Sequence, residues 1–278
     1  EFLLSDCTVP FPNSYTWFEA DLVVDGEPVQ SVGVRKKGFV GSALEDSHWR
    51  PSLKIKTDKF VDDQTLGDTE RITLNNNLTD STRMHTCLSY SVFDDAGYPA
   101  PRCNLAAVVV NGQPLGAYTH VEAIKKRFLE RAFGDASGHL YEGIIADFTP
   151  DHLAGTPESL GRWEAKTDDT DPTGEPLWAV TEALQASDDE LERALEAVID
   201  LDRFFTFWAL EALLAHTDGF NAGTNNFYVY FDPSDDGRAT LLPWGMDDAM
   251  ATGAAFDDPA WLHELFLLSE LARRCSRH

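Results

Sequence analysis

The chain has 278 residues, of which 43% are hydrophobic and 11% aromatic, and it carries a formal net charge of −25. This apolar content is typical of a globular fold and excludes a mainly disordered chain. The acidic balance excludes nucleic-acid binding through a basic surface, and no run reaches the ~18 apolar residues of a membrane span. The length suffices for one large domain or for two lobes around a cleft.

The start of the chain and its cysteines leave the cellular setting open. The opening E-F-L-L does not resemble a signal peptide, and we expect a trimmed mature form or an excised domain. The four cysteines lack the C-x-x-C spacing of a zinc ribbon. They fit two disulfides in an exported protein and, equally, four buried thiols in a cytosolic one. They are Cys7, Cys87, Cys103 and Cys275.

The first part of the chain predicts short strands. Residues 15–24 and 30–36, joined by an Asp-Gly turn, read as a hairpin. After a glycine-bearing loop, residues 51–57 alternate so that Lys54 and Lys56 share one face. Protein kinases cover ATP phosphates with such a loop and an inward lysine on the next strand. Taken alone, however, the stretch fits a hairpin with a solvated lysine face better.

A strand over residues 70–74 precedes a predicted helix, which Asp80 or Ser81 caps and which runs to about Ala96. Arg83 falls in the first turn of this helix, where a cation is unfavourable unless an anion is near. The position therefore indicates a phosphate partner or a pair with a surface Asp.

The clearest hairpin runs from residues 105–110 to residues 115–121 across an Asn-Gly turn. Glu122 ends its second strand and begins a predicted helix that closes near Gly134. Glu122 is thus either a ligand contact in a cleft or a helix-start glutamate.

The C-terminal half predicts mostly helices. Residues 144–175, rich in Asp, Thr, Gly and Pro, resemble a surface insertion. A helix capped by Asp202 is apolar nearly all round, which predicts a buried helix that leads to Asp218. Further helices are expected over 176–185, over 188–199 with a capping box at Ser187 and Glu190, and over 259–274.

The stretch 215–250 contains the largest group of candidate catalytic and metal-binding residues. Residues 227–231 and 239–242 flank Asp-Gly turn chemistry and predict a hairpin. Because a hairpin returns the chain to its starting end, five polar side chains should converge: Asp218, Asn225, Asn226, Asp247 and Asp248. Their oxygens are the ligands that Mg²⁺ or Mn²⁺ prefers beside phosphates. Protein kinases use a catalytic Asp, an Asn and a metal-binding Asp in this order; solvated acidic turns are the alternative.

Successive blocks of the chain, from about Gly33 to Asp248, resemble those of the CotH-type spore-coat kinases. The blocks are V-G-V-R-K-K-G, S-L-K-I-K-T-D-K-F, R-I-T-L-N-N-N-L-T-D-S-T-R-M, D-A-G-Y-P-A-P-R, V-N-G-Q-P-L-G-A-Y-T-H-V-E-A-I, N-N-F-Y-V-Y and L-L-P-W-G-M-D-D. The resemblance implies an atypical, secretory-type protein kinase of the α+β class. It further implies a β-rich N-lobe over about 1–121 and a mostly helical C-lobe over about 122–278, with a metal-site hairpin and an acidic insertion near 144–175.

The resemblance also implies an activity and a role for each site residue. An ATP- and divalent-metal-dependent kinase would phosphorylate Ser/Thr hydroxyls, with Asp218 orienting or deprotonating the acceptor. Asn226 and Asp247 would hold Mg²⁺ or Mn²⁺, with Ca²⁺ a further candidate ion and Asn225 and Asp248 further candidate ligands. The residues implied for the nucleotide are Lys54 on its phosphates with Lys56 as the fallback, Arg35 and Arg83 along the phosphate side, and Glu122, where the family keeps a glutamate.

One departure bears on activity. The family commonly has P-W-D-x-D, whereas this chain has P-W-G-M-D, with Gly245 in place of the first acid. If that acid carries metal, activity is lost; if only the second does, Asp247 suffices. The alternatives are therefore a catalytically dead binding or adhesion module of the same fold, and a kinase that acts on a small molecule or glycan.

The implied partner is a coat or cell-surface protein, or the chain itself through autophosphorylation. By analogy with relatives, the chain is expected to be exported, to the extracellular space or to a spore or cell surface.

Overall fold

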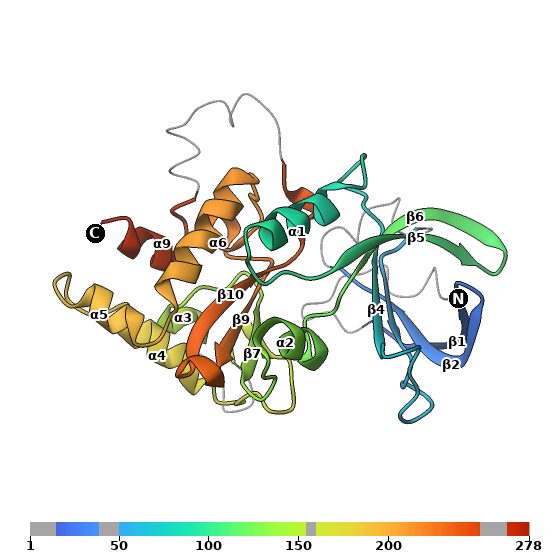
Figure 1. Ribbon diagram of the computed structural model, residues 1–278, viewed down its shortest axis with the longest axis horizontal. Coiled ribbons are helices and arrows are strands. Elements are labelled where there is room, and N and C mark those ends of the chain that lie inside the picture. Colours follow the sequence, from blue (N-terminus) through green and yellow to red (C-terminus); the bar gives the residue numbers. More distant parts are fainter. Residues whose placement is uncertain (1–14, 39–49, 154–159, 251–265, 278) are drawn as a thin grey trace. The chain divides into compact units, whose positions relative to one another are not determined.

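The computed structural model describes residues 15–38, 50–153, 160–250 and 266–277. The chain divides into two compact units, Glu1–Met84 with Arg102–Ala123 and His85–Pro101 with Ile124–His278. Each unit holds an antiparallel sheet, and the described helices belong to the second unit (Figure 1). The fold is therefore a mixed one of helices and strands, as the sequence predicts. Residues 85–101, which fall within the expected first lobe, belong to the second unit.

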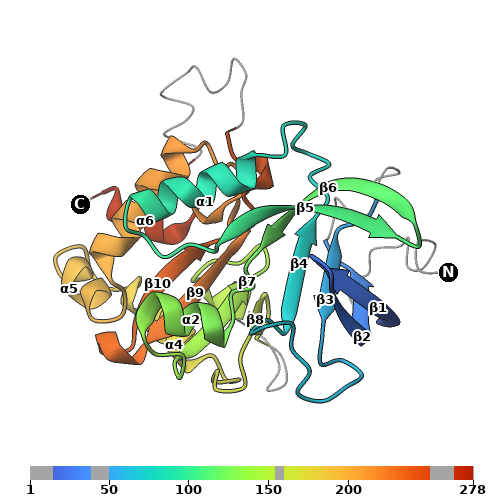
Figure 2. The same cartoon turned by 45° about the vertical axis from the view of Figure 1, so that its right-hand side comes forward.

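The first unit is built on a six-stranded sheet that curls along its length (Figure 2). The strand order is β1-β2-β3-β4-β6-β5, and each neighbouring pair is antiparallel. The strands are β1 (Phe18–Val24), β2 (Glu27–Lys36), β3 (Leu53–Lys56), β4 (Arg71–Asn75), β5 (Cys103–Val110) and β6 (Gln113–Val121). The two hairpins predicted in this part of the chain, β1–β2 and β5–β6, are confirmed.

The core of the first unit lies on one face of this sheet. Val32, Leu53, Ile55 and Tyr118 are buried in a single apolar cluster. Because side chains alternate along a strand, Lys54 points to the opposite face. The predicted alternation of residues 51–57 therefore holds in the structure.

The second unit contains a four-stranded sheet in the order β10-β9-β7-β8. Its strands are β7 (His139–Gly143), β8 (Trp163–Ala165), β9 (Phe227–Asp232) and β10 (Arg238–Pro243). Its helices are α1 (His85–Asp95), α2 (Lys126–Phe133), α3 (Pro150–Leu153), α4 (Glu175–Ala183), α5 (Leu191–Glu196), α6 (Leu201–Leu213), α7 (Phe220–Gly223) and α9 (Glu270–Cys275). No helix of the described residues is long and apolar enough to span a membrane.

Both faces of the second sheet are covered. On one face, Phe128 and Leu129 of helix α2 pack with Tyr230 of β9 and Leu242 of β10. On the other, the ring of Phe227 lies 4.6 Å from that of Phe220 in helix α7, between ring centroids. Strand β9 is buried at every residue. The residues that flank it are therefore attached to a well-packed strand.

Four local predictions need correction. Helix α1 begins at His85, so Arg83 precedes it rather than lying in its first turn. Helix α5 begins at Leu191 without a side-chain cap, so the Ser187–Glu190 capping box does not form. The cap of helix α6 is Asp200, which accepts from the Arg203 N–H at 3.1 Å, and not Asp202. Helix α6 also exposes Leu213 (73%), so it is not buried all round.

The segment 144–175 is not only a surface insertion. It contributes strand β8, which pairs antiparallel with β7 and so completes the sheet. Of the predicted helix over 259–274, residues 259–265 lie outside the described residues, and helix α9 (Glu270–Cys275) forms its last part. Cys87 and Cys103 are disulfide-bonded and Cys275 is a free thiol, so the cysteines fit neither expected pattern of four.

Candidate functional site

The hairpin predicted over residues 227–242 is confirmed. Strands β9 and β10 pair from Phe227 opposite Pro243 to Asp232 opposite Arg238. Beyond the ladder, the Trp244 N–H donates to the Asn226 carbonyl at 3.1 Å. The residues before β9 and after β10 are therefore held at the same end of the sheet.

Asp218 lies at the centre of this end. Its Oδ2 accepts a hydrogen bond from Asn226 Nδ2 at 2.6 Å, and its Oδ1 accepts one from Asn225 Nδ2 at 3.2 Å. Burial raises the pKa of Asp218, the Asn225 hydrogen bond opposes this, and the charges of Asp248 and Asp247 raise it further. Asn225 and Asn226 therefore contact Asp218, and the charges of Asp247 and Asp248 act on it.

Gly245 fits closely against Asn226. Its φ is +56°, in the left-handed region. A Cβ on Gly245 would lie 2.3 Å from Asn226 Oδ1 and 2.4 Å from Asn226 Cγ. The Asn226 carboxamide therefore fills the space that a side chain at 245 would need. Gly245, which stands in place of the first acid of the P-W-D-x-D pattern, therefore packs directly against Asn226.

A buried carboxylate from helix α6 organises the loop that carries Asp218. Glu211 is fully buried; its Oε1 accepts from the Phe220 N–H at 2.9 Å and its Oε2 from the Asn221 N–H at 3.0 Å and Asn221 Nδ2 at 2.7 Å. A Cβ on Gly219 would lie 2.2 Å from Glu211 Oε1. Helix α7, which is only one turn long, is thus anchored directly to helix α6.

His216 links this network to the far side of the hairpin. It is fully buried, and its Nδ1 lies 3.5 Å from Glu211 Oε1. Its Nε2 lies 3.3 Å from the Gly245 carbonyl and donates to it. The histidine therefore connects the start of the Asp218 loop with the residue that packs on Asn226. Glu211 and its contacts were not found from the sequence.

Tyr90 of helix α1 is a further neighbour that sequence reasoning missed. Burial raises its pKa well above the usual value, the charge of Asp247 adds to this, and a hydrogen bond with the Gly245 backbone opposes it. Helix α1 also packs against the short 3-10 turn Met246–Asp248. The charge of Asp247 thus acts on the Tyr90 hydroxyl as well as on Asp218.

The donor set suits a hard divalent cation. Asp218, Asp247 and Asp248 place mutually repelling carboxylates within electrostatic reach of one another, and Asn225 and Asn226 add amide oxygens. Mg²⁺ typically takes one or two carboxylates and completes its shell with water and phosphate oxygens. No group of three or more His, Cys, Asp or Glu forms a ready-made metal site in the described part of the chain.

The predicted nucleotide-binding residues lie in the first unit. Lys54 of β3 stands opposite Arg35 of β2 and opposite Thr73 of β4, so these three side chains share a face. Lys56 is paired with Asp58 at 3.2 Å. Glu122 Oε2 accepts from the Arg102 N–H at 2.9 Å, where β5 begins.

Arg83 is not brought together with Arg35 and Lys54. Its Nη1 lies 4.0 Å from the point that a Cβ would occupy if Gly116 of β6 carried a side chain. Near it, the guanidinium of Arg50 lies over the ring of Tyr118, a side chain of the core face. Lys54 points to the other face of the sheet.

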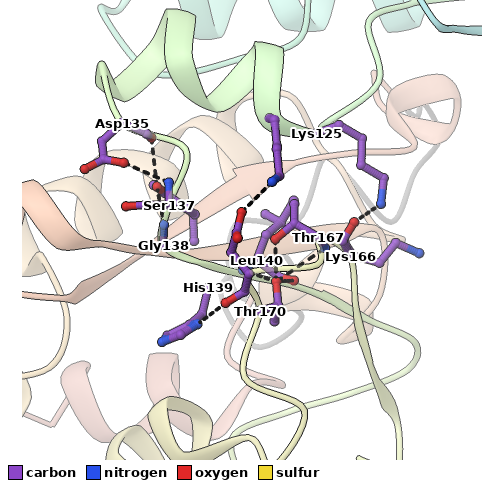
Figure 3. A network of polar contacts seen from close by, with 12 residues as sticks. Lys125, Asp135, Ser137, Gly138, His139, Leu140, Lys166, Thr167 and Thr170 are labelled. Atoms are coloured by element: carbon purple, nitrogen blue, oxygen red, sulfur yellow. Dashed lines mark hydrogen bonds and ion pairs between the residues drawn. The ribbon is translucent and has the colours of Figure 1, made fainter. Parts of the chain in front are cut away.

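A second polar network lies at the β7–β8 end of the second unit (Figure 3). Lys125 Nζ donates to the Lys166 carbonyl, and Thr170 Oγ1 accepts from the Leu140 N–H at 3.0 Å. The Lys166 ammonium pairs with Glu142 and, at 3.1 Å, with Glu164. This network ties residues 166–170 to the sheet, which is why part of the acidic segment is ordered structure.

The fold and the site together define a mixed helix-and-strand protein with an oxygen-rich cluster at the end of a buried hairpin. The profile of the family described as "CotH kinase protein" matches residues 35–262. The chain therefore belongs to the CotH kinase family.

Two curated relatives, both from Rhizopus delemar, match the chain at low identity. "Invasin CotH3" is 26% identical over 216 residues, covering 71% of this chain and 35% of the relative. "Invasin CotH2" is 24% identical over 194 residues, covering 66% and 32%. The chain thus spans about a third of the length of these relatives.

Proposed function

We propose that the chain is an ATP- and divalent-metal-dependent protein kinase that transfers the γ-phosphate to Ser/Thr hydroxyls of a protein, including its own. The observation that carries the proposal is the cluster around Asp218. A carboxylate bonded to two amides and flanked by two further carboxylates is the set that phosphoryl transfer needs, because that reaction depends on positioning and charge stabilisation. Family membership supports the same reading.

In this proposal each residue has a defined task. Asp218 orients the acceptor hydroxyl and accepts its proton. The hydrogen bonds from Asn225 and Asn226 hold the carboxylate in place. Asn226 Oδ1, Asp247 and Asp248 hold Mg²⁺ or Mn²⁺, which supplies positive charge to the phosphate oxygens. Arg35 and Lys54 bind the nucleotide phosphates, with Lys56 as the second lysine of that strand.

Asn226 also offers an answer to the missing acid at position 245. Because its carboxamide fills the space next to Gly245, an oxygen donor is still present where the acid is lost. In this proposal Asn226 and Asp247 suffice for metal binding.

The test is transfer of label from γ-labelled ATP with Mg²⁺ or Mn²⁺, to the protein itself or to an added acceptor protein. Asp218→Ala should lower the rate by about 10²- to 10⁴-fold, the usual contribution of a general base, while nucleotide still raises the melting temperature. Asp247→Ala should abolish the metal-dependent part of that rise. Equal transfer by wild type and Asp218→Ala would refute the assignment.

The second candidate is a binding or adhesion module without catalysis, because the two relatives are named invasins. It predicts neither label transfer nor a nucleotide-dependent rise in melting temperature. A third outcome, transfer to a small molecule or glycan but to no protein, would keep the chemistry and change the acceptor. The acceptor on a coat or cell-surface protein, and export of the chain to such a surface, belong to the same proposal.

A further inference from the structure

Arg50 is held in an unusual place for a charged side chain. It is only 7% exposed. Its Nε donates to the Leu115 carbonyl at 2.8 Å and its Nη2 to the Ala117 carbonyl. Its guanidinium lies 5.0 Å from the centroid of the Tyr118 ring, whose hydroxyl donates to the Pro51 carbonyl at 3.1 Å. The backbone and an aromatic ring of strand β6 therefore fix this cation without any carboxylate.

A second arginine lies beside it. Arg83 Nη1 is 4.0 Å from the Cβ position of Gly116, between the two carbonyl groups that Arg50 contacts. Burial lowers the pKa of Arg50, and the charge of Arg83 lowers it further. The two guanidinium groups are thus close enough to repel each other.

Within the described residues, neither guanidinium has a counter-ion. The hydrogen bonds of Arg50 go to carbonyl groups only, and its Nη1 makes none. The Arg83 guanidinium makes no hydrogen bond or ion pair with a described side chain. This is unexpected in a chain with 47 acidic and 22 basic side chains. A pair of like charges persists where another contribution offsets the repulsion, and a bound anion is the simplest one.

We propose that Arg50 and Arg83 form a binding site for a phosphoryl dianion. A phosphate monoester carries a charge of about −1.5 to −2 at neutral pH, which matches two cations better than a carboxylate does. Guanidinium N–H groups also match the geometry of phosphate oxygens. The ligand is the phosphoryl group of a phosphorylated Ser or Thr, or inorganic phosphate, because both present the same oxygens.

The site is separate from Arg35 and Lys54, with which the resemblance groups Arg83 along the nucleotide phosphates. Arg50 stacks on Tyr118, which belongs to the core face of the sheet, whereas Lys54 points to the opposite face. The inference also does not rest on kinase activity, because an anion site can bind without any transfer. A failure of one proposal therefore leaves the other intact.

The experiment uses the whole chain in chloride buffer without nucleotide or divalent metal. Inorganic phosphate is added at constant ionic strength while melting temperature and heat of binding are measured. Wild type should show a saturable rise in melting temperature. Arg83→Gln should bind phosphate at least about tenfold more weakly, the loss expected for charged hydrogen bonds. Arg102→Gln, an exposed arginine of the same unit, is the matched control and should behave as wild type.

A sharper signature separates binding from a folding defect. Without phosphate, Arg83→Gln should be at least as stable as wild type, because one of two repelling charges is gone. With saturating phosphate, wild type should be the more stable protein. A variant that merely folds poorly would be less stable in both buffers, which would contradict the proposal.

Further outcomes are equally decisive. No phosphate-dependent rise in wild type, or the same rise in Arg83→Gln, would overturn the site. An equal rise with acetate at the same ionic strength would overturn the phosphoryl ligand class. Phosphoserine binding more tightly than inorganic phosphate would assign the site to a phosphorylated protein, and the reverse order to free phosphate.

Discussion

The Asp218 loop and the β2–β3 strands both carry residues of the proposed site, but they hold them by different means. Lys54 and Arg35 are placed by regular strand pairing, so their shared face follows from alternation along the backbone. Asp218 and Asn226 are placed by an irregular loop, in which Asn226 has a φ of +47° and Asp218 is bonded to amide side chains. That loop depends on the buried Glu211 and His216 beneath it. We therefore expect the position of the loop to be far more sensitive to a single buried substitution than the positions of the strands are.

The largest expected effect comes from Glu211→Ala. It would leave the Phe220 N–H, the Asn221 N–H and the Asn221 side chain without their acceptor, each of them buried. We expect a loss of about 3–5 kcal/mol in the free energy of unfolding, measured by denaturant titration. Glu182→Ala, at an exposed glutamate of helix α4, is the control and should stay within about 0.5 kcal/mol. A loss as small as that of the control would mean that the buried network does not hold the loop.

The next effect concerns pH. Asp147 is 4% exposed, and burial raises its pKa to about 6 from 3.8, against the hydrogen bonds from the Glu270 and Phe148 N–H groups. The folded state therefore binds the proton more tightly than the unfolded state does, so stability is present at low pH and is lost as pH rises through about 6. Between pH 4 and 7, wild type should lose about 2 kcal/mol relative to Asp147→Asn.

The measurement is urea unfolding of both proteins across this pH range. Altered hydrogen bonding in Asp147→Asn adds an offset that is the same at every pH, so only the slope matters. Asp151→Asn, at an exposed position of helix α3, should follow the wild-type slope. Parallel curves for wild type and Asp147→Asn would show that the Asp147 carboxyl titrates alike in the folded and unfolded states.

The contrast between loop and strands also explains what the sequence could predict. The alternation that places Lys54 and the turn that pairs β9 with β10 are local patterns, and both were predicted. The convergence of Asp218, Asn226 and Asp247 followed from the hairpin alone. Glu211 and Tyr90 inside helices, and His216 shortly after helix α6, were not found, because a buried charged or polar residue resembles an ordinary surface residue in one sequence. Arg83 was misplaced because the start of helix α1 was set too early, and β8 was missed because it has only three residues.

A smaller effect is expected at Gly245, where loop and hairpin meet. Gly245→Ala would put a Cβ 2.3 Å from Asn226 Oδ1 and keep a φ of +56°. Gly237→Ala has a similar φ of +73° but nothing within 4 Å of the added atom. Both should lose about 1 kcal/mol from the strained backbone, and Gly245→Ala about 1–2 kcal/mol more from the contact. If Asn226 holds metal, only Gly245→Ala should also lose the Mn²⁺-dependent rise in melting temperature. Identical behaviour of the two variants would remove the link between Gly245 and Asn226.

The smallest effect tests the strand side of the comparison. Lys54 lies directly opposite Arg35 on β2, so that two cations adjoin there, whereas Lys56 lies opposite Gly33. Lys54→Gln should therefore weaken ATP binding about tenfold, as expected for the loss of one charged contact, and Lys56→Gln should leave it nearly unchanged. Both variants should fold with wild-type stability, because strand pairing uses the backbone rather than these side chains. ATP titration followed by melting temperature measures both effects. The reverse order of the two lysines would move the nucleotide contact to Lys56, and equal binding by all three proteins would remove β3 from the nucleotide site.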